Sequence, residues 1–285
     1  MRAQRRPTGR LIGFVTVWAA LLAPAACSAG DSGSLPATTS TTQTTTTTVA
    51  ETLTTTSTTL AGAEPAILVF HRTAGFRHDS IPNGIAALTE IGEERGFSVV
   101  ATEDPSVFTG SGLAEFGVIV FMNTTRDVLD AGQQAAMESH ITAGHGFVGI
   151  HAAADTEYEW PWYGGLVGAY FDGHPEPQQA SVRVVDSEHP VVRGLPVDFR
   201  RFDEWYDFRS VPEADVTILM TLDETSYEGG GMGENHPIAW AHEYDGGRSV
   251  YIGFGHTGES YSEPLVVTLL TNAIEWAAGV GPGSG

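Results

Sequence analysis

The sequence predicts an α/β fold in which a mostly parallel central sheet is flanked by helices. Continuously apolar runs recur after residue 65, and such runs are typical of strands that are buried on both faces. Segments with helical spacing of apolar residues separate the first of these runs, and strands that alternate with helices favour a parallel sheet. Residues 65–280 are expected to form one domain without internal repeats, followed by a short tail at 281–285.

The first half of this domain alternates regularly between strands and helices. Four strands are expected there: Ala66–His71, Phe97–Val100, Gly117–Met122 and Gly146–His151. A helix should follow the first strand, because Ser80 and Pro82 favour a helix start and Gly96 favours a helix end. A second helix is expected near Asp130–Ala143, before the fourth strand.

The second half of the domain has fewer helical segments. Four more strands are expected in it: Val182–Val185, Val216–Leu222, Ile238–Glu243 and Ser249–Phe254. Pro264 should begin a closing helix that runs through Leu269 and Trp276 to Gly279.

Residues 1–27 have the layout of a signal peptide. Four arginines lie within residues 2–10, an uncharged run from Leu11 to Ala26 follows, and no acidic residue precedes Asp31. The apolar run is short for a transmembrane helix and contains Pro24. The protein is therefore expected to be exported from the cell.

The end of this leader has two interpretations. Ala25-Ala26-Cys27 resembles the end of a bacterial lipobox, so that a lipid on Cys27 would anchor the protein to the outer face of the membrane, although Pro24 stands where leucine is usual. Alternatively, ordinary cleavage beside Ala25 or Ala26 would release a secreted protein. Because Cys27 is the only cysteine, no internal disulfide can form.

Residues 28–64 are expected to form a disordered tether. The segment from Leu35 to Ala61 consists mostly of threonine and serine, with few large apolar side chains. Such a segment cannot bury enough apolar surface to offset the entropy lost on ordering. The tether would hold the domain away from a membrane or wall.

The charge of the chain excludes one class of partner. The formal net charge is −21, from 35 acidic residues and 14 basic residues, all of them arginine. This field repels a phosphate backbone, so no nucleic-acid partner is expected.

Three apolar runs end in histidine or lead straight to it. These histidines are His71, His151 and His256. Because parallel strands deliver their carboxyl ends to one edge of a sheet, where α/β sites form, the three are expected to lie close together. Arg77 and His78 follow the first, and Asp155 follows the second. One histidine at a strand end is commonly structural, but three at equivalent ends favour a site.

Later segments place aromatic side chains beside carboxylates and imidazoles. With His71, the candidate substrate-binding residues are Trp160, Trp162, His174, Glu204, Trp205, His236 and Tyr261. Aromatic faces stack on the C–H faces of sugars while polar groups bind the hydroxyls, so this composition suits a carbohydrate. The alternative is that the tryptophans and tyrosines belong to the core.

Histidines with aspartate and glutamate could also bind a divalent metal ion. No spacing such as His-x-x-x-His on a helix indicates such a site, and the ligands would have to come from separate loops. The sequence leaves the cofactor, and any metal ligands, undecided.

Together these segments resemble the ThuA-like family, which is named for trehalose utilisation and has the class I glutamine amidotransferase-like fold. The matching segments run in order through residues 66–278: Phe70-His71 with Gly75–His78, Gly149–His151 with Asp155, Gly168–Pro175, His189-Pro190, Asp203–Tyr206, His236–Trp240 and Gly255–Thr257. The resemblance implies a flavodoxin-like three-layer sandwich. In amidotransferases of this fold, a nucleophilic cysteine occupies the turn after the strand that matches Val148–Ile150. Here His151 lies in that region and the domain has no cysteine, which excludes glutamine hydrolysis by a thiolate.

The resemblance implies an enzyme that acts on a carbohydrate, either an oxidised (keto) sugar or a disaccharide related to trehalose. In a keto sugar the carbon beside the carbonyl can lose a proton, and a histidine could accept it. His151 is the expected base, Arg77, His78 and His256 would polarise or position the substrate, and Asp155 would orient a histidine. Two alternatives remain, a noncatalytic carbohydrate-binding module on a tether and a metal-dependent hydrolase.

Most of six histidines are expected to converge on one pocket. They are His71, His78, His151, His174, His236 and His256. The remaining four, His140, His145, His189 and His242, are expected to lie outside it.

Overall fold

A computed structural model describes residues 66–213 and 215–280. The predicted signal peptide, the lipobox at Cys27, the tether and the tail lie outside the described residues. Within the described part, no helix is long and apolar enough to cross a membrane.

The parallel half of the sheet contains the strands expected in the first half of the domain. Across it the order is β2 (Ser98–Thr102), β1 (Ala66–Phe70), β3 (Phe116–Met122), β4 (Gly146–Ile150) and β11 (Gly247–Ile252), all in parallel pairs. Every residue of β1 and β4 is buried, as their apolar runs predicted. The predicted α/β fold with a mostly parallel central sheet flanked by helices is confirmed.

An antiparallel half extends this sheet beyond β11. The order continues with β10 (His236–Tyr244), β9 (Thr217–Asp223), β6 (Gln178–Val184) and β7 (Asp198–Asp203). Two short strands, β5 (Phe171–Gly173) and β8 (Asp207–Phe208), form a separate ladder. The sequence patterns did not predict β5, β7 or β8. They are short, or, as in β7, rich in charged residues, so they give no apolar run.

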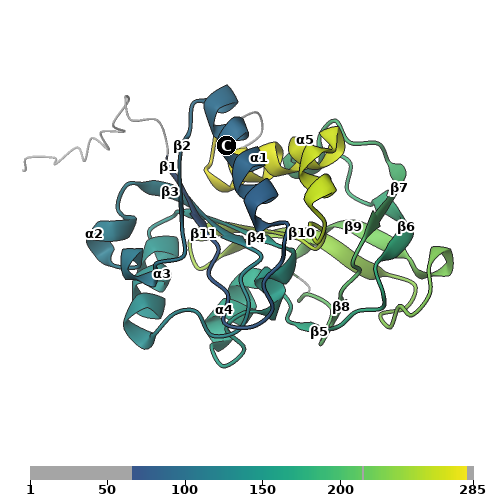
Figure 1. Ribbon diagram of the computed structural model, residues 1–285, viewed down its shortest axis with the longest axis horizontal. Coiled ribbons are helices and arrows are strands. Elements are labelled where there is room, and N and C mark those ends of the chain that lie inside the picture. Colours follow the sequence, from purple (N-terminus) through teal and green to yellow (C-terminus); the bar gives the residue numbers. More distant parts are fainter. Residues whose placement is uncertain (1–65, 214, 281–285) are drawn as a thin grey trace, which may run out of the picture. The chain divides into compact units, whose positions relative to one another are not determined.

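Helices cover both faces of the sheet (Figure 1). Helices α1 (Ile81–Arg95) and α5 (Pro264–Ala277) contact each other on one face, and α2 (Gly110–Leu113), α3 (Ala131–Thr142) and α4 (Pro161–Val167) lie on the other. The left-handed backbone at Gly96, with φ of 78°, ends α1. A capping box between Asp130 and Gln133 begins α3. These layers form the predicted three-layer sandwich.

Aromatic rings fill the space between the sheet and the helices of the second face. Phe121 of β3 contacts Phe70, Phe147 and Tyr163 with ring centroids 5.4, 5.4 and 5.6 Å apart, and all four rings are fully buried. Interlocking rings of this kind hold the strands in register beneath the edge where the site lies.

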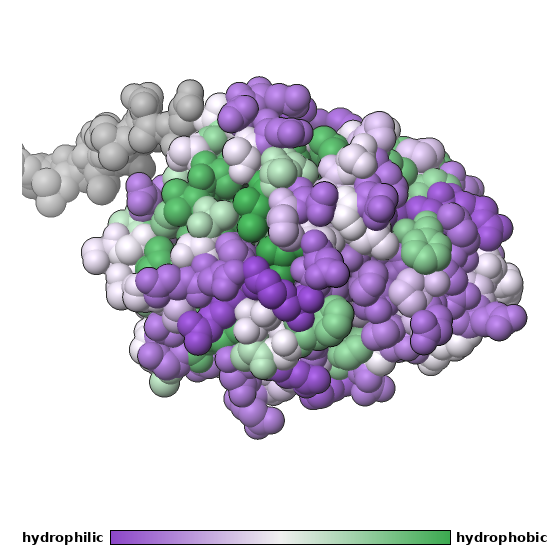
Figure 2. Space-filling model, viewed as in Figure 1, coloured by the Kyte–Doolittle hydropathy of each residue, from purple (hydrophilic) through white to green (hydrophobic). Residues whose placement is uncertain are grey.

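The surface agrees with the acidic composition. Figure 2 shows a mainly hydrophilic face, with apolar side chains gathered over the region of α1 and the edge strand β2. Val100 of β2 is one exposed apolar residue, with 44% of its side chain accessible. Single exposed residues of this kind are ordinary on an edge strand.

His140 gives the fold a measurable dependence on pH. It is buried on α3 and stacks on His145 with ring centroids 4.0 Å apart. Burial, with the nearby His145, lowers the pKa of His140 to about 4. Because its pKa is lower in the folded state, this contribution to stability is present above about pH 6.5 and is lost as the pH falls toward 4.

The variant His140→Leu should remove this loss. Between pH 7.5 and pH 4.5, its free energy of unfolding should fall less than that of the wild type, by on the order of 1–2 kcal/mol after allowance for solvent screening. Urea denaturation at both pH values measures this difference, and comparison within each protein cancels the packing effect of leucine. Equal pH dependence in the two proteins would show that His140 titrates normally.

Candidate functional site

Three histidines meet at the carboxyl edge of the parallel strands. His151 directly follows β4, His256 follows β11, and His78 lies in the loop after β1. Their ring centroids are 4.9 Å (His78–His151), 5.2 Å (His78–His256) and 5.6 Å (His151–His256) apart. Parallel strands that end at one edge bring these side chains together.

His151 occupies an unusual backbone position. Its φ is 46°, in the left-handed region. His151 follows the extended residue Ile150 and is the first residue of a short 3₁₀ helix (His151–Asp155). A residue other than glycine pays about 1–3 kcal/mol for such a conformation, which persists only where the surroundings determine it. The Tyr251 hydroxyl donates to the His151 carbonyl at 2.8 Å, and the ring Nδ1 lies 3.0 Å from the Gly253 carbonyl oxygen. The sharp turn after β4 therefore places the His151 imidazole at the carboxyl edge of the sheet.

Glu204 lies at the centre of the histidines. Its Oε2 is 3.3 Å from His151 Nε2 and 3.2 Å from His256 Nδ1, and its Oε1 is 3.3 Å from His174 Nδ1. The carboxylate is nearly buried, whereas the His174 side chain is 37% exposed. One carboxylate thus links the buried His151 and the half-buried His256 on one oxygen with the more exposed His174 on the other.

Asp203, which the sequence patterns did not single out from its neighbours, holds this arrangement together. Its Oδ1 accepts hydrogen bonds from the backbone N–H groups of Glu204 (2.9 Å) and His256 (3.0 Å), and its Oδ2 accepts one from Gly255 (3.1 Å). Arg201 lies 3.0 Å from Oδ2 and is also buried. Asp203 therefore ties the end of β7 to the turn after β11 and aligns Glu204 with His256.

The charges at the centre are strongly coupled. Burial disfavours ionisation of Glu204, but the close contacts with His151 and His256 outweigh it, so the pKa of Glu204 lies well below the usual range. The close contact with Glu204 raises the pKa of His256. Burial, with the charges of His151 and His256, lowers the pKa of His78 to about 3. His78 is therefore neutral at physiological pH beside an ionised carboxylate.

Several buried ring nitrogens in this cluster have no hydrogen-bond partner. Within the described part of the chain, they include both nitrogens of His78, Nε2 of His151 and Nδ1 of His256. A ligand atom from each of the three histidines and from Glu204 lies within 4.8 Å of the others. These four residues, which come from separate loops, could hold a metal ion.

A hollow of about 810 Å³ opens beside the cluster. It is lined partly by His256 and Thr257. Polar side chains also line it from the loop before α1 (Asp79), from α1 (Asn83 and Glu90) and from the 3₁₀ helix Gly258–Ser262 (Glu259). Phe76 is 65% exposed and its ring lies 4.8 Å from that of His78. His256 therefore joins the cluster to this hollow, whereas His78, His151 and Glu204 are not among its lining residues.

Comparison with known proteins identifies the family of the domain. The family model described as ThuA, trehalose utilisation, matches residues 66–277. The chain belongs to the ThuA family. No curated protein matches it significantly.

Solved structures support the same assignment. A ThuA-like protein from Bacteroides uniformis ATCC 8492 is 26% identical, with a TM-score of 0.65 over 76% of this chain and 93% of that chain. A ThuA-like protein from Parabacteroides merdae ATCC 43184 is 21% identical, with a TM-score of 0.63 over 75% and 90%. A protein of Salmonella typhimurium described as cytoplasmic is 15% identical, with a TM-score of 0.54 over 74% and 98%, and shares the fold. The ThuA domain has the glutamine amidotransferase-like fold.

Three residues predicted for the site of the ThuA domain make their contacts elsewhere. His71 and Arg77 both contact Glu103, at 3.2 and 2.6 Å, and not the cluster around Glu204. Asp155 accepts a hydrogen bond from Tyr158 at 2.5 Å and lies 3.5 Å from Arg126. Asp155 is therefore not observed to orient a histidine, and Arg77 pairs with an acid at the surface.

The predicted aromatic contacts with substrate need correction. Trp160, Trp205 and Tyr261 are buried, and their polar atoms bond to Glu138, the Gln178 carbonyl and the Gly255 carbonyl. Trp162 stacks on Trp160 and donates to Asp245. Trp160 and Trp205 pack in the fold, whereas Tyr261 also lines the hollow beside His256. Composition alone does not distinguish a core aromatic from a binding platform.

His236 belongs to a second polar group. Its Nδ1 lies 2.8 Å from Glu224 Oε1 and 3.0 Å from the Tyr227 hydroxyl, and its Nε2 lies 2.8 Å from the Tyr206 carbonyl oxygen. The Tyr206 ring packs on His151 at 4.2 Å. His236 therefore lies behind the ring that supports the cluster, so the structure brings together His78, His151, His174 and His256 among the six.

The four histidines expected outside the site make other contacts. His140 and His145 stack on each other, His189 contacts Trp276, and His242 Nε2 lies 3.0 Å from the Leu166 carbonyl oxygen. None of these partners belongs to the group around Glu204.

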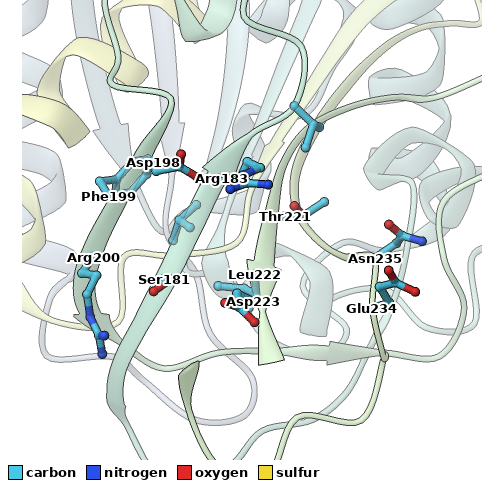
Figure 3. A pocket seen from close by; sticks show the side chains of 12 residues that line it. Ser181, Arg183, Asp198, Phe199, Arg200, Thr221, Leu222, Asp223, Glu234 and Asn235 are labelled. Atoms are coloured by element: carbon cyan, nitrogen blue, oxygen red, sulfur yellow. Dashed lines mark hydrogen bonds and ion pairs between the residues drawn. The ribbon is translucent and has the colours of Figure 1, made fainter. Parts of the chain in front are cut away.

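Another hollow, of about 650 Å³, lies on the antiparallel half of the ThuA domain (Figure 3). Figure 3 shows Arg183 beside Asp198 on neighbouring strands, with Glu234 and Asn235 across the hollow. The Arg183–Asp198 pair spans 2.7 Å, but both side chains are more than 60% exposed. Exposed charges that already pair give no sign of a site.

Proposed function

We propose that the ThuA domain is an enzyme that acts on a carbohydrate and that His174 transfers the proton. One observation carries this proposal: an exposed imidazole is fixed to a buried carboxylate beside a group of buried histidines. General bases in enzymes are commonly imidazoles whose second ring nitrogen is held by a carboxylate.

The contacts of His174 assign its neutral tautomer. Its Nδ1 lies 2.9 Å from the Pro175 carbonyl oxygen and 3.3 Å from Glu204 Oε1, and both of these atoms only accept hydrogen bonds. Nδ1 therefore carries the proton, which leaves a lone pair on Nε2. The exposure of the ring gives a substrate access to this nitrogen.

His151, the base expected from the sequence, is less suited to that role. Its side chain is fully buried, its Nδ1 is committed to the Gly253 carbonyl, and its Nε2 faces Glu204. A base must approach within hydrogen-bond distance of the substrate proton. We therefore assign proton transfer to His174 and leave His151 in the buried group.

The reaction that fits these residues begins with a keto sugar. His174 Nε2 removes the proton from the carbon beside the carbonyl, and the C–H electron pair forms a C=C bond as the carbonyl π pair moves to oxygen. The His256 ring, which lines the hollow, stabilises the negative charge on the oxygen of the resulting enediolate. Return of the proton to the former carbonyl carbon, with transfer of the neighbouring hydroxyl proton to the former carbonyl oxygen, gives an isomer. If the glycosidic oxygen instead leaves from the carbon next to the deprotonated one, the proton on His174 passes to that oxygen and the disaccharide is cleaved.

The lining of the hollow beside His256 supports a neutral sugar. Asp79, Glu90 and Glu259 contribute carboxylates, and no arginine lines this hollow among the described residues. Such a surface disfavours a phosphorylated substrate. Asn83 and Thr257 offer hydrogen bonds that suit hydroxyl groups. The family description, trehalose utilisation, favours the same substrate class.

Incubation of the purified protein with oxidised disaccharides and their parent sugars tests this function. NMR spectroscopy should detect an isomerised or cleaved product from at least one keto sugar. If no sugar in a broad panel is converted, whether the protein is supplied with divalent metal ions or not, the enzymatic proposal fails. Saturable calorimetric binding without a product would instead indicate the noncatalytic carbohydrate-binding module.

We also propose that the activity is extracytoplasmic, on the strength of the leader in residues 1–27. If Cys27 is lipidated, the variant Cys27→Ala should move the protein from the membrane fraction to the medium. Immunoblotting of cell fractions measures this. A wild-type protein that is already wholly in the medium would exclude the lipid anchor, and one that stays in the cytoplasm would exclude export.

A further inference from the structure

We infer that His78, His151, His256 and Glu204 bind a divalent transition-metal ion. The inference concerns the same group of side chains as the proposed function and in that respect rests on it. It requires no particular substrate, however, and metal binding can be measured without turnover.

The unpartnered ring nitrogens are the first evidence. Buried polar groups normally have hydrogen-bond partners, and an unsatisfied one costs about 1–3 kcal/mol. Here His78, His151 and His256 all carry such atoms in one cluster. A metal ion would satisfy several of these nitrogens at once, which no hydrogen bond between the described residues does.

The distances to Glu204 fit shared ligation better than hydrogen bonding. His151 Nε2 and His256 Nδ1 lie 3.3 and 3.2 Å from the same oxygen, yet neither makes a well-directed hydrogen bond with it. Metal–ligand bonds of about 2.0–2.2 Å in a tetrahedral site place neighbouring ligand atoms about 3.3–3.6 Å apart. The observed separations are therefore close to the edges of a coordination polyhedron.

The orientation of the rings supports the same conclusion. The three imidazole planes cross at 85°, 88° and 74°, so the rings do not stack on one another, and one nitrogen of each lies within 4.8 Å of those of the other two. His151 Nδ1–H donates a hydrogen bond to the Gly253 carbonyl oxygen. In the neutral ring, Nε2 of His151 therefore carries a lone pair. That lone pair faces a carboxylate oxygen, a repulsive arrangement that a cation between them converts into attraction. Such carbonyl partners typically orient metal-bound histidines.

The second histidine group provides a contrast within the same domain. His236, Glu224 and Asp207 are also close enough to share an ion. However, both nitrogens of His236 have partners, and Glu224 Oε1 accepts hydrogen bonds from the backbone N–H groups of Met232 and Gly233. The polar atoms of that group already have hydrogen-bond partners within the protein, so we do not infer a metal site there.

The donor set narrows the identity of the ion. Three imidazoles and one carboxylate suit zinc, iron, cobalt or nickel better than calcium or magnesium, which prefer oxygen ligands. Beside a bound keto sugar, such an ion would polarise the carbonyl oxygen and stabilise the enediolate. His174 contacts only the other oxygen of Glu204 and would stay free to transfer the proton.

Titration of the purified, chelator-stripped protein with Co²⁺ and Zn²⁺ tests the inference. One equivalent of Co²⁺ should produce a visible absorption band from histidine ligation, and Zn²⁺ should displace it. His256→Ala and, as a second variant, Glu204→Gln should each weaken binding on the order of a hundredfold or more. His189→Ala, a half-buried histidine away from the cluster, and His174→Gln should bind like the wild type.

The outcomes separate the two proposals. Absence of a stoichiometric cobalt band in the wild type, or equal affinity in His256→Ala and Glu204→Gln variants that keep the wild-type circular dichroism, would overturn the metal site. If both variants unfold, zinc must raise the melting temperature of the stripped wild type, and no rise would overturn the site equally. Metal binding without turnover of any sugar would overturn the proposed function alone. Full turnover by the stripped protein, together with the absence of a cobalt band, would overturn the metal inference alone.

Discussion

Replacing Asp203 by asparagine is expected to lower the free energy of unfolding by about 3–5 kcal/mol. Asp203 is fully buried and pairs at 3.0 Å with Arg201, whose side chain is 3% exposed. An asparagine removes the negative charge and leaves the buried guanidinium with the Ser260 hydroxyl at 2.8 Å and, as a charged partner, the more distant Glu263 at 3.4 Å. Breaking one side of a buried ion pair is costly because the remaining charge stays in a medium that solvates it poorly.

The hydrogen bonds of Asp203 add to this cost. Its carboxylate accepts from the N–H groups of Glu204, Gly255 and His256 and from the Ser260 hydroxyl. Asparagine keeps one acceptor oxygen, and its amide group would face donors at the other position. The variant should therefore also loosen the alignment of Glu204 with His256.

The matched control is Asp198→Asn, at the other end of the same strand. Asp198 pairs with Arg183 at 2.7 Å, but the two side chains are 61% and 66% exposed. Exposed ion pairs contribute about 0–1 kcal/mol, so this variant should be nearly as stable as the wild type. Urea denaturation of both variants measures the difference. An equal loss of unfolding free energy in the two variants would show that burial of the Arg201–Asp203 pair does not determine how much the pair stabilises the fold.

Replacing His174 by glutamine is expected to lower kcat by about 10²–10⁴-fold, the usual contribution of a general base. Glutamine has a similar length and can still hydrogen-bond to Glu204, but it cannot accept a proton at neutral pH. KM should change much less than kcat, because the ring transfers the proton and does not hold the sugar. Stability should change little, since the side chain is 37% exposed.

Steady-state kinetics on the keto sugar that is converted measures this effect. The cobalt spectrum of the variant shows whether the neighbouring centre stays intact, so that loss of the base can be told from loss of the metal. His189→Gln serves as the control, because His189 packs against Trp276. A kcat within about tenfold of the wild type would assign the base to another residue.

The fold class could be predicted from the sequence because its signals are local. Buried parallel strands require runs of apolar residues, and β1, β3 and β4 contain them. The strand-end rule brought His151 and His256 together without any structural information. The same rule was wrong for His71, whose ring contacts Glu103 and not the cluster around Glu204.

The centre of the site could not be predicted in the same way. Glu204 follows β7, a charged strand that β10, β9 and β6 separate from β11 in the sheet order. Even so, Asp203 at the end of β7 bonds to the backbone of His256 after β11. Contacts between residues so distant in both sequence and sheet order arise from the path of the whole antiparallel half, which no local pattern encodes.

The amino-acid pattern alone therefore specified an α/β domain of the ThuA family and placed a histidine at the turn after β4. It also excluded cysteine chemistry, because the domain has no thiol. Tertiary structure decided which polar side chains face one another: Glu204 lies beside His78, His151, His174 and His256, while Trp160 and Trp205 are buried in the core. The physical reason is that apolar periodicity determines which face of an element is buried. The meeting of charged groups depends on how separate elements pack.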